Sequence, residues 1–204
     1  MIKNIIFDLG NVLINWKPAE FLENAGYNDP IKSQIVNYIF NGPEWRQLDN
    51  GDITVNEAIN KIARKSSLPR SEIKAVFDLR TKIITPINSN IELLPELKKR
   101  GYKLYYLSNF PDDIFDEVCN KYDFFNYFDG GEISARLRAS KPDKRIYRLF
   151  LQKYFLKPGD CLFIDDMSIN ADSAENIGMK AIHLKEPLEL KSKLENILGI
   201  TLNI

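Results

Sequence analysis

The sequence predicts an α/β fold: a doubly wound, Rossmann-like parallel sheet with a small helical cap inserted after the first strand. From residue 91 onward, apolar β-type runs alternate with helical segments, which is typical of a parallel sheet covered on both faces. Between about residues 17 and 84 the periodicity is helical, with no convincing strand. We therefore expect an α/β core domain of residues 1–15 and 86–204 and a helical cap domain of residues 16–85.

The first strand is predicted at residues 3–7, where an apolar run leads into a polar turn. The cap contains four predicted helices. The first opens at residues 18–22 and stops at Gly26, the second follows the capping pair 29–30, the third follows a capping box at 54–57, and the fourth starts at Ser71. Residues 42–52 are predicted to be a turn-rich segment of the cap.

The rest of the core is predicted as alternating helices and strands. Helices are expected at residues 91–100, 112–122, 143–154, 170–177 and 188–198. Strands are expected at residues 103–107, 127–129, 161–164 and 180–184.

Composition excludes several classes of function. The chain has 204 residues, enough for one domain with a small insertion. Basic and acidic residues number 28 each, so no global field for nucleic acid or an anionic membrane is expected. No apolar segment is long enough to span a bilayer, and the two cysteines form no redox pair. We expect a cytoplasmic monomer with no nucleic-acid or membrane partner.

Polar side chains stand at the ends of three predicted strands. They are Asp8, the pair Ser108 and Asn109, and the pair Asp165 and Asp166. Because the ends of parallel strands converge at one sheet edge, these groups are expected around one small volume.

Lys141 adds a cation, just before a helix whose start is marked by proline. A carboxylate nucleophile, a divalent cation, a hydroxyl-plus-amide cradle and one lysine are what phosphoryl transfer through a covalent aspartyl intermediate requires. The sequence therefore predicts this chemistry at the sheet edge.

These motifs resemble those of the haloacid dehalogenase superfamily of phosphatases, in the same order and across most of the chain. The four matching segments are residues 7–12, 107–109, 141–143 and 163–166, the last followed by Asn170 and Gly178. The form of the first motif is similar to that of a bacterial subgroup that includes glucose-1-phosphate phosphatases. The resemblance also implies the helical cap.

The resemblance implies a role for each candidate site residue. Asp8 would be the nucleophile and a Mg²⁺ ligand, and the backbone carbonyl of Gly10 a second ligand. Asp165 and Asp166 would complete an oxygen-only shell, which suits Mg²⁺; which of them binds directly stays open. The phosphoryl group would be held by Ser108, Asn109 and Lys141.

The sequence departs from the family pattern at Gly10. Active family phosphatases usually carry an aspartate there, as acid for the leaving group and base for hydrolysis. A positioned acid–base group contributes about 10²–10⁴-fold, and less where the leaving group is stable. The departure favours anomeric sugar phosphates or other good leaving groups. Alternatively, a cap acid (Glu44, Asp49 or Asp52) replaces the missing group.

The expected function is therefore Mg²⁺-dependent hydrolysis of a small phosphorylated metabolite. One alternative is carbon–halogen hydrolysis, in which Asp8 attacks carbon; the acid pair Asp165 and Asp166 argues against it, since without a metal it would repel an anionic substrate. The other alternative is a phosphate-binding regulatory protein whose catalysis lapsed when the acid was lost.

Overall fold

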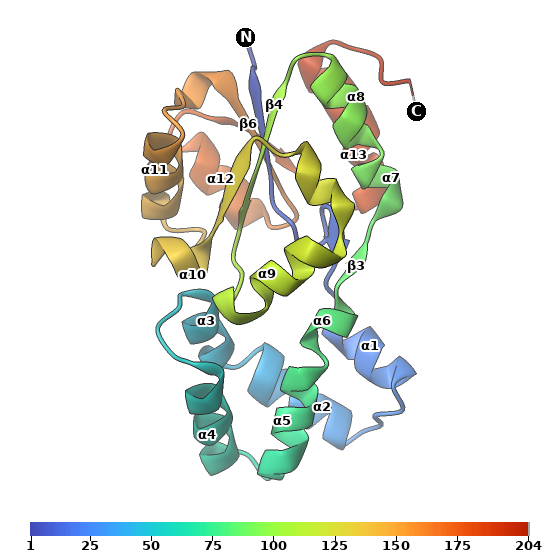
Figure 1. Ribbon diagram of the computed structural model, residues 1–204, viewed down its shortest axis with the longest axis vertical. Helices are drawn as coiled ribbons and strands as arrows, with labels where there is room; N and C mark the ends of the chain where they lie inside the picture. Colours follow the sequence, from blue (N-terminus) through green and yellow to red (C-terminus); the bar gives the residue numbers. More distant parts are fainter. Residues whose placement is uncertain (204) are drawn as a thin grey trace.

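Five parallel strands form the central sheet of the computed structural model, which describes residues 1–203 (Figure 1). Their order is β5-β4-β1-β6-β7. Their bounds are β1 Asn4–Phe7, β4 Lys103–Ser108, β5 Gly130–Ile133, β6 Cys161–Asp165 and β7 Lys180–His183. The first strand of the chain lies in the middle, paired with β4 and β6. The predicted parallel α/β fold is confirmed.

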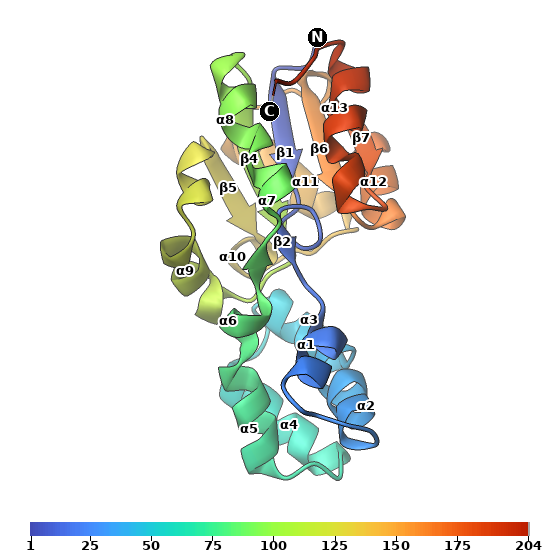
Figure 2. The same ribbon diagram turned by 90° about the vertical axis from the view of Figure 1, so that its right-hand side faces the viewer.

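Helices cover both faces of the sheet (Figure 2). One face packs against α7 (Asn88–Ile91), α8 (Leu93–Lys99), α9 (Asp112–Lys121) and α13 (Leu190–Leu198). The other packs against α10 (Ser134–Leu137), α11 (Lys144–Lys153) and α12 (Ser168–Glu175). Short 3-10 turns lie at Asp123–Tyr127, Pro158–Asp160 and Pro187–Glu189. All four residues of β1 are buried, which places the polar strand ends on a rigid base.

The segment between β2 (Ile14–Asn15) and β3 (Thr85–Pro86) forms a helical lobe at one end of the sheet (Figure 1). These two strands pair antiparallel and are the two chain connections of that lobe. Its helices are α1 Pro18–Asn24, α2 Ile31–Ile35, a π-helical turn Val36–Phe40, α3 Pro43–Asp49, α4 Val55–Lys65, α5 Arg70–Asp78 and α6 Arg80–Ile83. The lobe has its own hydrophobic cluster, separate from those of the sheet. We refer to it as the cap.

The predicted capping box is present: the Thr54 hydroxyl accepts from the Glu57 backbone, and the Glu57 carboxylate accepts from the Thr54 backbone. The prediction of a turn-rich segment at residues 42–52 was wrong, because residues 43–49 form α3. Pro43 opens that helix, a position where its missing N–H costs no hydrogen bond. Read from the sequence, Gly42 and Pro43 look like loop residues only.

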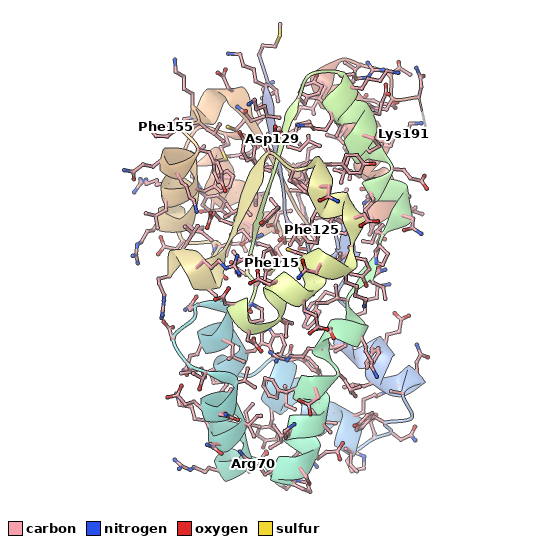
Figure 3. The ribbon with its side chains drawn as sticks, in the orientation of Figure 1. Arg70, Phe115, Phe125, Asp129, Phe155 and Lys191 are labelled. Carbon is pink, nitrogen blue, oxygen red and sulfur yellow. The ribbon has the colours of Figure 1, made fainter. Side chains whose placement is uncertain are left out.

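The predicted strand at residues 127–129 was also misplaced; the strand begins at Gly130. A Cβ at Gly130 would lie 2.5 Å from the Tyr154 ring, and one at Gly131 would lie 2.3 Å from the Tyr106 ring. The two glycines thus leave room for the two tyrosine rings against the edge strand. In the sequence alone, two consecutive glycines suggest a turn, so the strand was placed too early. Figure 3 shows the aromatic packing near this edge, where the rings of Phe115 and Phe125 lie 6.1 Å apart.

Among residues 1–203, no helix has the length and apolar character needed to cross a membrane.

Candidate active site

The predicted site residues gather at one end of the sheet, facing the cap. A cavity of about 320 Å³ lies there, within the usual range of small-molecule sites. Its lining includes Asp8, Gly10, Ser108, Asn109, Lys141 and Asp166. Asp165 is fully buried behind this lining, where it contacts Lys141.

Asp8 follows the last residue of β1, and its backbone N–H continues the ladder to Ile164 at 2.8 Å. Its Oδ1 accepts the backbone N–H of Leu9 at 2.7 Å. Burial raises the pKa of Asp8 to about 7, although the Lys141 ammonium and the Ser108 hydroxyl oppose that shift. The site is therefore organised to hold a carboxylate whose charge needs further compensation.

Lys141 joins two of the carboxylates. Its Nζ lies 2.9 Å from Asp8 Oδ1 and 2.6 Å from Asp165 Oδ2, and its side chain is 1% exposed. Burial lowers the pKa of Lys141, but Asp165 and Asp8 raise it by more, so the net shift is upward. The lysine therefore stays charged and fixes the position of the Asp8 carboxylate.

The side chain of Asn109 holds the Lys141 segment in place. Asn109 Oδ1 accepts the Lys141 backbone N–H at 2.8 Å, and Asn109 Nδ2 donates to the Lys141 carbonyl at 2.9 Å. The predicted cradle residue thus also positions the lysine, a contact that strand order alone does not reveal.

The two adjacent acids at the end of β6 have different surroundings. Both oxygens of Asp165 are taken: Oδ1 accepts from the Met167 backbone and from Asn170 Nδ2, each at 2.9 Å, and Oδ2 meets Lys141. Asp166 lines the cavity and accepts a hydrogen bond from Asn11 Nδ2 at 3.0 Å. Burial raises the pKa of Asp166, with Asn11 opposing. Asp166 is therefore the more available ligand.

Asn11 is a site residue that the sequence analysis missed. It has a left-handed backbone with φ of 53°, which asparagine tolerates better than most residues. Its amide joins Asp166 to the start of the cap, because Oδ1 accepts the Trp16 backbone N–H at 3.1 Å. An asparagine in a tight turn after a strand was the available signal.

The site is suited to a divalent cation. Oxygens of Asp8, Asp165 and Asp166 all lie within 4.8 Å of one another. Three carboxylates face one lysine, so the cluster carries excess negative charge, and oxygen donors of this kind are what Mg²⁺ prefers. The residues present therefore fit the predicted cofactor.

The cap side of the cavity is apolar, with one exception. Its aromatic part is formed by Trp16, Phe40 and Trp45, whose rings pack on one another with centroids 5.1–5.8 Å apart. The exception is Asp49, the last residue of α3. The cavity thus has a charged floor and an aromatic roof carrying one carboxyl group.

The comparisons with known proteins agree with this geometry. The family described as haloacid dehalogenase-like hydrolase matches residues 2–178. A sesquiterpene phosphatase of Aspergillus oryzae, astK, is 28% identical over 197 residues, covering 97% of each chain.

Two solved structures have the same fold. The haloacid dehalogenase family enzyme BT-2542 of Bacteroides thetaiotaomicron, a magnesium complex, has a TM-score of 0.67 at 25% identity; the match covers 89% of this chain and 92% of that one. L-2-haloacid dehalogenase of Xanthobacter autotrophicus has a TM-score of 0.70 at 17% identity, covering 100% of this chain and 85% of that one.

Proposed function

The chain belongs to the haloacid dehalogenase-like hydrolase family, and from this premise we propose that it hydrolyses a small phosphomonoester through a phosphoryl group carried on Asp8. The observation that carries the proposal is the lysine bridge, in which one buried ammonium contacts the Asp8 carboxylate and Asp165. A carboxylate fixed in this way, with its pKa raised by burial, is suited to attack phosphorus beside a compensating charge.

Each predicted residue has a role in this proposal. Asp8 Oδ attacks phosphorus, the ester P–O bond breaks, and water then displaces Asp8 from the phosphoryl group. Ser108, Lys141 and the backbone N–H of Asn109 hold the transferring oxygens. Closure of the cap excludes bulk water, so the carboxyl and ammonium charges act in a less polar medium.

Mg²⁺ is the proposed cofactor, held by Asp8, Asp166 and the Gly10 carbonyl, with Asp165 as a support. Because both Asp165 oxygens are occupied by protein donors, we assign direct binding to Asp166. The bound ion supplies charge that offsets the repulsion between phosphate and carboxylates. The magnesium complex of BT-2542 supports this choice.

Carbon–halogen hydrolysis is the rival reaction, since a dehalogenase has the same fold. That reaction needs no metal, and without one an anionic haloacid would meet three carboxylates and one lysine here, so net repulsion argues against it. The sesquiterpene phosphatase astK, at 28% identity, is more similar in sequence to this chain than the dehalogenase, at 17%, which also favours phosphoryl transfer.

The substrate is proposed to be a phosphate ester of an apolar alcohol. The sequence alone favours an anomeric sugar phosphate or another ester with a good leaving group. The sugar phosphate therefore stays a prediction, to be tested against the ester of an apolar alcohol. Sugar hydroxyls need polar partners, whereas Trp16, Phe40 and Trp45 offer aromatic faces to the part of the substrate beyond the phosphate. The relative that is a sesquiterpene phosphatase supports an apolar substrate.

Phosphate release tests the proposal. The substrates are p-nitrophenyl phosphate, farnesyl monophosphate, glucose 1-phosphate, glucose 6-phosphate and acetyl phosphate, each with Mg²⁺ and with EDTA. We expect Mg²⁺-dependent turnover, with the farnesyl ester preferred over both sugar esters. Turnover that survives EDTA would contradict the metal assignment. Phosphate binding without turnover of any ester would favour the lapsed phosphate-binding protein.

A further inference from the structure

Gly10 supplies no side chain that could protonate the leaving group of the proposed reaction. An alkyl ester leaves as an alkoxide, a poor leaving group unless its oxygen is protonated as the P–O bond breaks. The sequence left three cap acids as possible donors: Glu44, Asp49 and Asp52.

The structure separates these three acids. Glu44 is buried within the cap and paired with Lys65. Asp52 is exposed and accepts Asn50 Nδ2 at 3.2 Å. Asp49 lines the cavity that also contains Asp8 and Gly10. Of the three, Asp49 alone faces the space where an ester would lie.

The carboxyl group of Asp49 lacks the contacts that would hold it ionised. Its Oδ1 is buried and has no hydrogen-bond partner among the described residues. Burial raises the pKa of Asp49 to about 8, and the nearby charge of Asp8 adds to the shift. A carboxyl group in these surroundings holds its proton at neutral pH, as a general acid must.

The segment that begins at Asp49 is docked on the core. Ser134 Oγ donates to the Asp49 carbonyl, Ser140 Oγ donates to Asn50 Oδ1, and Arg138 donates to the Gly51 carbonyl. Gly51 has a positive φ of 70°, and a Cβ there would lie 2.8 Å from the Ala135 carbonyl oxygen. Three consecutive residues of the cap are thereby fixed against α10 and the segment that follows it, which sets the position of Asp49.

We propose that Asp49 of the cap is the general acid–base that replaces the side chain absent at Gly10. This inference rests on the proposed function and adds the proton transfers to it. As the bond from Asp8 Oδ to phosphorus forms and the ester P–O bond breaks, the Asp49 carboxyl gives its proton to the leaving oxygen. Its carboxylate then takes a proton from water as the water oxygen attacks phosphorus and Asp8 leaves. The docked cap thus completes the catalytic set.

Leaving-group dependence tests the inference. Asp49→Asn keeps the size of the side chain and removes the transferable proton. We expect kcat/KM for an alkyl ester, farnesyl monophosphate, to fall by about 10²–10⁴-fold. For p-nitrophenyl phosphate, whose phenolate leaves without protonation, we expect a loss of less than about tenfold. The matched control is Asp52→Asn, an exposed cap acid three residues further on, which should leave both rates unchanged.

The outcomes are distinct. Equal losses on both esters would assign Asp49 a structural role and overturn the inference, as would an unchanged alkyl rate. Wild-type protein that releases no phosphate from any ester with Mg²⁺ would instead overturn the proposed function on which the inference rests.

A second variant sharpens the test. A Cβ at Gly10 would meet only Trp16 Cβ, at 3.9 Å, and the backbone there is not left-handed, so position 10 accepts a Cβ without a clash. We expect Gly10→Asp to raise alkyl-ester turnover at least about tenfold in the Asp49→Asn background, and less in wild type. An equal gain in both backgrounds would mean that position 49 supplies no proton.

Discussion

The two sides of the cavity treat a buried carboxyl group in opposite ways. On the core side, both oxygens of Asp165 accept from Lys141, Asn170 or the Met167 backbone. On the cap side, Asp49 Oδ1 is buried and has no hydrogen-bond partner within residues 1–203. Donors surround the first carboxylate, whereas burial raises the pKa of the second to about 8. In the proposed mechanism the core therefore supplies the nucleophile and fixed charge, and the cap supplies substrate contacts and the proton.

Removing the nucleophile is expected to have the largest effect on this division of labour. Asp8→Asn should lower phosphate release by at least about 10⁴-fold, because the amide cannot form the covalent intermediate. The fold should persist at reduced stability, since the amide has the size of the carboxylate and Asp165 still pairs with buried Lys141. Release assays and thermal unfolding check the two statements. Activity within about tenfold of wild type would place the chemistry elsewhere.

The two neighbouring acids of β6 provide a matched pair. Asp165→Asn should reduce the free energy of unfolding by about 3 kcal/mol, because it removes one of the two charges that pair with buried Lys141. Asp166→Asn should cost much less stability while weakening Mg²⁺ binding, since Asp166 lines the cavity and makes fewer contacts. Denaturant unfolding and Mg²⁺ titration check both. Equal losses of stability would contradict the distinction.

The raised pKa of the Asp49 carboxyl group should make stability depend on pH. Its pKa is about 8 in the folded protein against an ordinary value near 4, so between these values the folded state binds more protons than the unfolded state. The free energy of unfolding of the wild type therefore falls as pH rises from about 4 to 8. Asp49→Asn should gain relative to wild type over that window, reaching a few kcal/mol at most. Denaturant unfolding in EDTA at pH 5 and pH 8.5 tests this; a relative gain that shrinks with pH would contradict it.

The smallest effect is expected at the mouth of the cavity. Met167 lines the cavity and is 54% exposed, while Ile169 is equally exposed but lies outside the lining. Met167→Gln should raise KM for farnesyl monophosphate several-fold, consistent with about 1 kcal/mol of lost apolar contact, and leave p-nitrophenyl phosphate nearly unaffected. Ile169→Gln is the control. A similar rise in both variants would argue against an apolar contact at Met167.

The core side of the site could be predicted from the sequence, and the cap side could not. Asp8, Ser108 and Asp165 stand at the ends of apolar strands, and parallel topology brings strand ends together whatever the loops do. No such rule places α3, because its position depends on packing between two lobes. Asp49 was therefore one of three equivalent acids until its helix, its docking on α10 and its missing partner were seen. The strand that begins at Gly130 was likewise misplaced, because the ring that makes glycine necessary there, that of Tyr154, comes from a distant segment of the sequence.

The most direct test of the account is to locate the phosphoryl group and the water oxygen during a single turnover. Protein mixed with p-nitrophenyl phosphate and Mg²⁺ in water labelled with heavy oxygen is quenched in acid, digested and analysed by mass spectrometry. We expect one phosphoryl group on the peptide that contains Asp8 at early times, and heavy oxygen in the released phosphate but none in Asp8. Heavy oxygen in the Asp8 carboxylate, or no phosphorylated peptide at any time, would contradict the proposed attack of Asp8 on phosphorus.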